Sequence, residues 1–226
     1  SDREFLDIPI IRPPIEEQRA IVHEIGDTLD DIEAYIAKKR KLIDLLETQR
    51  RAVINRAVTQ GLDDGVEMTD SDVEWLGEIP AHWDEIRLRY ATTYVTSGSR
   101  GWGQYYDEDG HALFVRIGNL RSDSIELDLS DTEYLTLPEN AEGKRTRLEA
   151  GDVLVSITAE IGSVGVVPED IGEAYVNQHV ALTRPRTELI DPEWMGYALL
   201  SQMARPQLRS ALYGGTKDGL SLADVK

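Results

Sequence analysis

Apolar residues between Val22 and Ala57 recur at alternating spacings of three and four, which is the spacing of the buried seam of a coiled coil. Lys39 and Arg50 interrupt the seam. Because full burial of these charges would be costly, we expect them to mark register, partner choice or a wet patch. The pattern predicts one long coiled-coil helix over residues 15–60. Its interface positions are Val22, Ile25, Leu29, Ile32, Ile36, Ile43, Leu46, Val53 and Ala57.

The segment before this helix predicts a strand that ends in a rigid turn. Pro13 and Pro14 should end the extended residues 8–11, because proline fixes φ and lacks a backbone donor. Glu16 and Glu17 place negative charge in the first helical turn. The helix would run roughly 65 to 70 Å, longer than a compact domain of this size is wide, so it needs a partner helix. An ordinary amphipathic core helix is the alternative, but such helices are usually shorter and have a wider apolar stripe.

Residues 61–82 are expected to form an acidic linker into a second domain. Gly61, Gly65 and Gly77 favour the end of the helix and the start of turns. Residues 61–85 carry acidic side chains and no basic ones.

Residues 83–226 read as one globular α+β domain. Short apolar runs between Gly, Asp and Pro turns predict strands over residues 87–95, 112–117, 125–127, 152–157, 164–167 and 179–184. Two helical segments are expected at residues 192–201 and 204–212. The expected fold is therefore a twisted, mostly antiparallel sheet joined to the long coiled-coil helix.

The composition sets outer limits on these expectations. With 226 residues and 41% hydrophobic content, the chain can bury one globular core beside the helix. The sequence suggests no transmembrane span and no secretory signal. The absence of cysteine excludes disulfides and thiolate metal sites, and a cytoplasmic protein is the simplest expectation. The chain also lacks an initiating Met and begins within a predicted strand, so we expect either a fragment or a half-length chain that pairs with another.

The net charge of −18 argues against broad binding of DNA through its phosphates, since that affinity depends on Lys and Arg. Adaptation to concentrated salt is one explanation, because Arg outnumbers Lys and acidic residues abound. The other explanation is simply an acidic protein, and the sequence leaves both open.

Motifs for catalysis are missing from the sequence. His23, His82, His111 and His179 are scattered, with no His-Glu-x-x-His pair. There is no Gly-x-Ser-x-Gly elbow and no Asn-Pro-Pro-Tyr motif of DNA amino-methyltransferases. We therefore expect neither an enzyme nor a metal site in this chain.

Five segments occur in the order in which one family shows them, namely residues 73–83, 114–120, 151–158, 174–180 and 214–222. They resemble the target recognition domain in specificity subunits of type I restriction-modification systems. Residues 8–18 resemble that family's exit from a recognition domain into its conserved helix. The resemblance implies that residues 1–14 end a preceding recognition domain and that residues 83–226 form a second one.

The resemblance also implies function and partners. Such a subunit reads a bipartite site in double-stranded DNA, and its paired helices fix the separation of the two readers. Methyltransferase and restriction subunits dock on it. S-adenosylmethionine, ATP and Mg are expected on those partners, with no cofactor in this chain. The second conserved helix would come from a homodimer or from the rest of a longer subunit.

The candidate DNA-binding residues carry groups that can reach base edges or phosphates. In the loop of residues 97–106 they are Ser99, Arg100, Trp102, Gln104 and Tyr105, although Trp102 is equally suited to covering the core. Elsewhere they are Arg116, Asn119, Lys144, Arg145, Arg147, Asn177, Gln178, Thr216 and Lys217. His179 is a further possible base reader. Structural hydrogen bonding is the alternative for Arg116, Asn119 and residues 177–179, and a solvated loop is the alternative for residues 144–147.

An interaction scaffold without DNA specificity is the second hypothesis, and the net charge favours it. The two are distinguished by whether the basic side chains gather on one side of the domain. Those side chains belong to Arg100, Arg116, Lys144, Arg145, Arg147 and Lys217. The DNA sequence, the half-site spacing and the orientation of the helix partner do not follow from the sequence.

Overall fold

The computed structural model describes residues 7–73, 76–98, 100–138, 144–159, 161–204 and 207, without the side chain of Lys144. It separates into two compact units, Ser1–Gln49 and Arg50–Lys226, and each is described by itself. Ser99, Thr216, Lys217 and nearly all of the helix predicted at residues 204–212 lie outside the described residues.

The long helix predicted from the heptad spacing is present as α2 (Ile15–Gln60). It begins directly after Pro14, whose carbonyl oxygen accepts the backbone N–H of Gln18 at 3.0 Å. The first turn carries Glu16 and Glu17, which suit the positive end of the helix dipole. The seam residues of the first unit are exposed, for example Val22 at 70%. The coiled-coil interface therefore stays a prediction, because a partner helix would have to cover it.

The last turns of α2 belong to the second unit and pack on it. Val58 is buried, and Ile54 packs against a cluster that includes Ile125, Met195 and Leu200. Together these contacts make the end of the helix part of the globular core.

Residues 61–82 contain a small antiparallel pair of strands, β1 (Met68–Asp70) and β2 (Glu78–Pro80), which the linker interpretation did not include. Ile79 is buried although it follows the exposed Glu78. Gly61 has φ +78°, so it can end α2 in the left-handed conformation that glycine favours.

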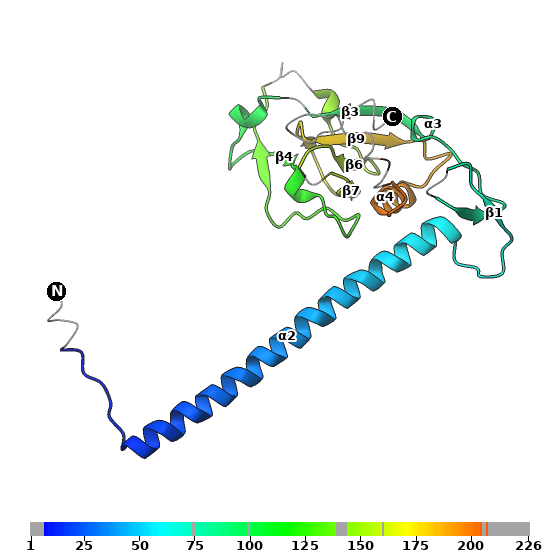
Figure 1. The fold of residues 1–226 in the computed structure, drawn as a ribbon. Coiled ribbons are helices and arrows are strands. Elements are labelled where there is room, and N and C mark those ends of the chain that lie inside the picture. Colours follow the sequence, from blue (N-terminus) through cyan, green and yellow to red (C-terminus); the bar gives the residue numbers. More distant parts are fainter. Residues whose placement is uncertain are drawn as a thin grey trace. The chain divides into compact units, whose positions relative to one another are not determined.

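Two sheets form the rest of the domain (Figure 1). The first is antiparallel with the order β3-β9-β6-β7, in which the strands are β3 (Thr92–Ser97), β9 (Val180–Pro185), β6 (Val153–Ser156) and β7 (Val164–Val166). The second has the order β5-β4-β8, with β5 (Glu133–Leu135), β4 (Ala112–Val115) and β8 (Ala174–Val176). β4 runs antiparallel to β5 and parallel to β8.

Helix α4 (Pro192–Leu200) covers part of the first sheet, where Met195 and Leu200 contact Val153 and Val164. Asp191 caps this helix, because its side chain accepts the backbone N–H of Trp194 at 2.9 Å. The two sheets share a core in which Leu113 and Val115 of β4 meet residues of β6, β8 and β9.

Several predicted strands differ from the observed elements. Residues 87–95 were expected to form one strand, but they begin with a short helix, α3 (Leu88–Ala91), before β3 starts. Residues 125–127 form an isolated bridge between Glu126 and Val166 rather than a strand, because the ladder with β7 does not extend beyond that one pair. Strands β5 and β8 were not predicted. The α+β class with mostly antiparallel sheets beside a long helix is confirmed.

Candidate nucleic-acid interface

The ends of three strands meet at one edge of the domain. β4 and β8 are parallel and pair Val115 with Val176, so the chain leaves both strands on the same side. The Asn177 N–H donates to the Val115 carbonyl at 3.0 Å, and the Gly98 N–H donates to the Asn177 carbonyl at 3.2 Å. The structure therefore brings Arg116, Asn177 and the loop that follows β3 to one place.

A tight turn joins β8 to β9 at this edge. The Val180 N–H donates to the Asn177 carbonyl at 3.2 Å, which puts Gln178 and His179 at the two corners of the turn. The Asn177 Oδ1 accepts the His179 N–H at 3.0 Å and closes the turn a second time. The Ile157 N–H donates to the His179 carbonyl at 3.0 Å. The turn is thus tied to its neighbours on both sides.

Gly98 allows the loop to approach this turn closely. A Cβ atom at this position would overlap the backbone carbonyl oxygens of Val176 and Asn177, so a larger residue cannot occupy the site without moving the backbone. The absence of a side chain at Gly98 therefore allows the loop predicted to face DNA to pack against the turn.

Within that loop the predicted residues have different surroundings. Trp102 is only 4% exposed, and its ring stacks on Phe114 with centroids 6.0 Å apart and meets the edge of Tyr175. This placement supports the alternative in which Trp102 covers the core. Arg100 and Gln104 are exposed and Tyr105 is half-buried, so these side chains remain candidates for contact with a ligand.

Asn119 is placed as a structural residue. It is 3% exposed, and its Nδ2 donates to the carbonyl oxygens of Asp128 and Asp131, both at 2.8 Å. Its Oδ1 accepts the Arg116 backbone N–H at 2.8 Å. Both ends of the amide are thus occupied by backbone groups, which supports the structural alternative.

Arg116 follows β4 and points to carboxylates rather than to open surface. Its Nη1 lies 3.1 Å from Glu133 Oε1, and its Nη2 lies 3.1 Å from Asp131 Oδ2. The Nε atom is buried without a hydrogen-bond partner. This arrangement again favours a structural role.

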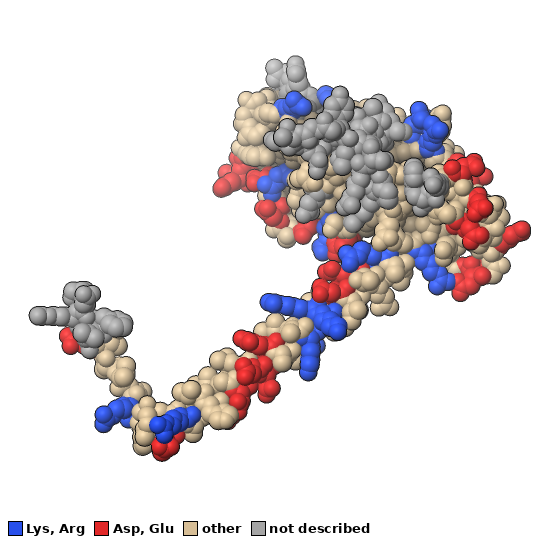
Figure 2. Space-filling view, in the orientation of Figure 1, with Lys and Arg blue, Asp and Glu red and all other residues tan. Residues whose placement is uncertain are grey.

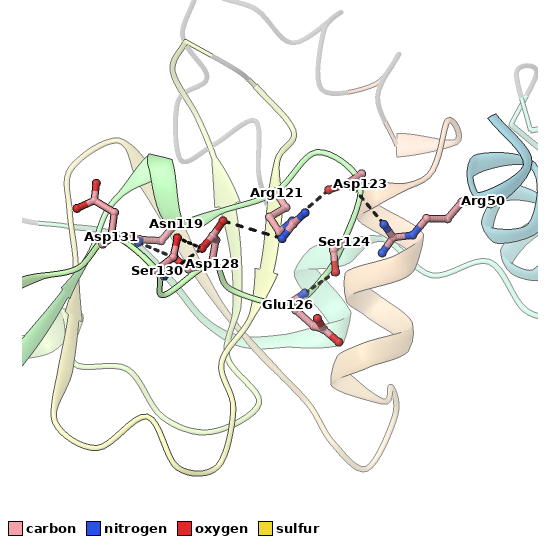
Figure 3. A network of polar contacts seen from close by, with 9 residues as sticks. All are labelled: Arg50, Asn119, Arg121, Asp123, Ser124, Glu126, Asp128, Ser130 and Asp131. Carbon is pink, nitrogen blue, oxygen red and sulfur yellow. Dashed lines mark hydrogen bonds and ion pairs between the residues drawn. The ribbon is translucent and has the colours of Figure 1, made fainter. Parts of the chain in front are cut away.

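The loop that follows Asn119 in the sequence carries a network of polar contacts that includes Arg50 of helix α2 (Figure 3). Arg121 lies between two carboxylates, 3.3 Å from Asp123 and 3.9 Å from Asp128. The Ser130 hydroxyl, 2.6 Å from the Asp128 carboxylate, lowers the pKa of Asp128 together with the Ser130 N–H. Arg50 of α2 donates to the other oxygen of Asp123.

The basic residues of the 144–147 segment lie beside β8. The short helix η3 (Lys144–Thr146) precedes a bridge between Arg147 and Tyr175 of β8. The side chains of Arg145 and Arg147 are exposed, while the Arg145 carbonyl accepts the hydroxyl of Tyr94 at 3.2 Å. Because β8 ends at the turn described above, the bridge places Arg147 beside the strand that leads into Asn177.

Thr158 is a residue that the sequence analysis did not select. Its Oγ1 lies 3.0 Å from His179 Nδ1, and Gln178 Nε2 lies 3.0 Å from His179 Nε2. Thr158 lies two residues after the end of β6, and this position just beyond a buried strand is the signal that could have identified it.

Comparison with known proteins finds specificity subunits of type I restriction enzymes among the similar chains. The chain is 25% identical over 238 residues to the type I restriction enzyme EcoBI specificity subunit of Escherichia coli, covering 100% of this chain and 48% of the relative. It is also 25% identical over 217 residues to the type I restriction enzyme MjaVIII specificity subunit of Methanocaldococcus jannaschii, covering 93% of this chain and 48% of that protein. The chain thus spans about half the length of these curated relatives. No protein-family model matches.

A solved structure supports the fold. A chain from a type I restriction-modification system superposes with a TM-score of 0.56 at 20% identity, covering 94% of this chain and 46% of that one. The resemblance to specificity subunits that the sequence predicts is confirmed. In the described part of the chain, none of the helices has the length and apolarity needed to cross a membrane. No group of three or more His, Asp or Glu side chains that could hold a metal ion occurs there either.

Proposed function

We propose that this chain reads one half of a bipartite DNA site as part of a specificity subunit of a type I restriction-modification complex. The observation that carries the proposal is the turn Asn177–Val180, which displays hydrogen-bonding side chains at the edge where strands end. Amide side chains of this kind can read base edges in the major groove. The similarity to specificity subunits along the whole chain supports the same function.

The negative net charge of the chain affects how it would bind DNA. With a net charge of −18 the chain gains little from general attraction to phosphates, so binding should depend on the correct base sequence more than on DNA as such. The guanidinium groups of Arg100, Arg145 and Arg147 are exposed, and they would contact phosphates of the DNA backbone.

We further propose that α2 pairs with an antiparallel helix. The seam is nearly symmetric about Ala34, so an antiparallel second copy would match Ile32 with Ile36, Ile25 with Ile43, and Val22 with Leu46. In an antiparallel pair the a and d positions of the two helices face each other, as these matches require.

The charge along the helix favours the same direction. Acidic side chains gather over residues 24–33 and basic ones over residues 38–41, as Figure 2 shows along the helix. An antiparallel copy places the acidic stretch near the basic one, whereas a parallel copy in register places like charges together. Either a second copy or a similar helix from a longer subunit satisfies this pattern.

Engineered cysteines test the direction, because the natural chain has none. In an antiparallel pair, a mixture of the Ile32→Cys and Ile36→Cys variants should form mixed disulfide dimers in preference to dimers of either variant alone. A parallel pair would give the opposite preference, and monomers by analytical ultracentrifugation would point to a helix from elsewhere in a longer subunit.

The partner subunits belong to the proposal as well. Methyltransferase and restriction subunits would dock on this chain in the cytoplasm, and they would hold S-adenosylmethionine, ATP and Mg. The reading function is tested by selecting from a random-sequence duplex pool with the chain bound to its candidate methyltransferase subunit. Enrichment of a bipartite site with a fixed gap supports the proposal. A stable complex without any enrichment would contradict it and favour the scaffold alternative.

A further inference from the structure

Hydrogen bonds from three neighbouring segments fix the turn between β8 and β9, which carries the side chain of Gln178. The backbone of the turn is held by Val115 of β4, Gly98 after β3 and Ile157 after β6, through the three hydrogen bonds described above. Gln178 occupies the first corner of the turn and is half-buried. A side chain on such a fixed corner loses little conformational freedom on binding, which is what a specific contact needs.

A chain of hydrogen bonds orients the amide of Gln178. The Gln178 Nε2 lies 3.0 Å from His179 Nε2, and an amide nitrogen can only donate, so the ring nitrogen accepts. The imidazole then carries its proton on Nδ1, which donates to Thr158 Oγ1 at 3.0 Å. Ala159, next to Thr158, has φ +54°, a conformation that costs energy for a residue with a side chain. The surrounding structure therefore holds the backbone next to Thr158 in a strained conformation.

This arrangement leaves a defined set of groups on Gln178. One amide hydrogen is used by His179, and among the described residues the second hydrogen and the Oε1 carbonyl have no further partner, so they can contact a ligand. One donor and one acceptor side by side match the N7 and N6 positions of adenine in the major groove. The same pair does not match guanine, which offers two acceptors there.

We propose that Gln178 reads an adenine in the major groove and that His179 and Thr158 are positioning residues that hold its amide in the reading orientation. This inference rests on the proposed DNA-reading function. It assigns the base at one position of the half-site, and it gives Thr158 a role that acts through two other side chains.

The test uses the full chain bound to its candidate methyltransferase subunit and a random-sequence duplex pool. Gln178→Ala should reduce the preference for adenine at one base pair by roughly 5- to 150-fold and leave the other positions unchanged. Thr158→Val keeps the shape but removes the hydroxyl, and it should weaken the same preference by roughly 2- to 10-fold. Thr158→Ser restores the hydroxyl and should recover the wild-type profile. Thr93→Val, which removes an exposed hydroxyl at the other end of β3, is the matched control.

An imidazole measurement checks the positioning directly. ¹⁵N NMR of the histidine ring should show the proton on Nδ1 of His179 in the wild type, and Thr158→Val should change this tautomer while Thr93→Val does not. Thermal unfolding confirms that each variant folds.

The outcomes separate the two proposals. If the wild type enriches a site but Gln178→Ala leaves its base profile unchanged, the inference fails and the proposed function stands. If Thr158→Val behaves like Thr93→Val in both measurements, the positioning role fails while base reading by Gln178 survives. If the wild type enriches no sequence, both the proposed function and the inference are overturned.

Discussion

The guanidinium Nη1 of Arg50 lies 3.1 Å from the Asp123 carboxylate, so the end of α2 and the loop after η2 (Ile117–Asn119) are joined by an ion pair (Figure 3). Arg50 interrupts the apolar seam in the sequence, and this pair explains why a charge is tolerated there. The same carboxylate also receives Arg121, so one acidic side chain connects the helix to the polar network of the domain.

The Arg50–Asp123 pair should contribute little to stability, because both side chains are partly exposed. A double-mutant cycle of Arg50→Ala and Asp123→Ala, followed by urea unfolding, should give a coupling of about 0.5 kcal/mol. Arg51→Ala, on the adjacent exposed arginine, is the control and should show no coupling to Asp123. A coupling above about 2 kcal/mol would mean that the pair is far more shielded from water than the structure places it.

Asn119 should matter for folding rather than for base reading. Asn119→Ala leaves the carbonyl oxygens of Asp128 and Asp131 and the N–H of Arg116 without their partner, and it should lower the free energy of unfolding by about 2 kcal/mol. Chemical denaturation measures this loss. The base profile of the folded variant should match the wild type, and a change at one base pair with unchanged stability would show that Asn119 reads DNA instead.

Gly98 should be intolerant of substitution. Gly98→Ala forces its Cβ against backbone carbonyl oxygens and should lower the free energy of unfolding by about 1 to 3 kcal/mol. Gly103→Ala is the control in the same loop, since its Cβ would meet only the Tyr106 ring at 3.9 Å. Equal losses in the two variants, measured by thermal unfolding, would contradict the close packing of the loop on the turn.

Asp152 predicts a pH dependence. Its side chain is 1% exposed, and burial raises the pKa of Asp152, while the Arg184 guanidinium at 2.7 Å from Oδ1 opposes the rise. Because the pKa is higher in the folded state, ionised Asp152 costs folding energy as pH rises through that pKa. Arg184→Gln removes the opposing charge, so the pKa should rise further.

The stability lost in Arg184→Gln should therefore be small at about pH 4 and reach about 3 kcal/mol at about pH 7. Urea unfolding at both pH values measures it, with Arg145→Gln as the exposed control. A loss of the same size at both pH values would show that Asp152 is not the group responsible.

Local patterns in the sequence were enough to predict some elements and not others. The spacing of Val22, Ile25 and Leu29 predicts α2 because a heptad repeat reports helical periodicity within a few turns. The run of apolar residues in β6 likewise predicts a buried strand. β5 and β8 have three residues each, too few to show an alternation, and β8 exists because it pairs with β4 from a distant part of the chain.

The candidate site was predictable to a similar degree. Residue chemistry identified Gln178 and Asn177 as hydrogen-bonding groups, and the structure places them on one turn. It did not decide between surface and interior for Trp102 and Asn119, because burial depends on segments that are far apart in the sequence. Thr158 gains its importance only from His179, which the fold brings within 3.0 Å.

The proposed function requires that this chain bind one DNA sequence in preference to others. The most direct test is the ratio of dissociation constants for a selected duplex and for the same duplex with its half-site replaced, measured at the same salt concentration with the methyltransferase subunit bound. We expect the dissociation constants to differ by a factor of at least about 10³. Equal dissociation constants for the two duplexes would contradict the proposed function.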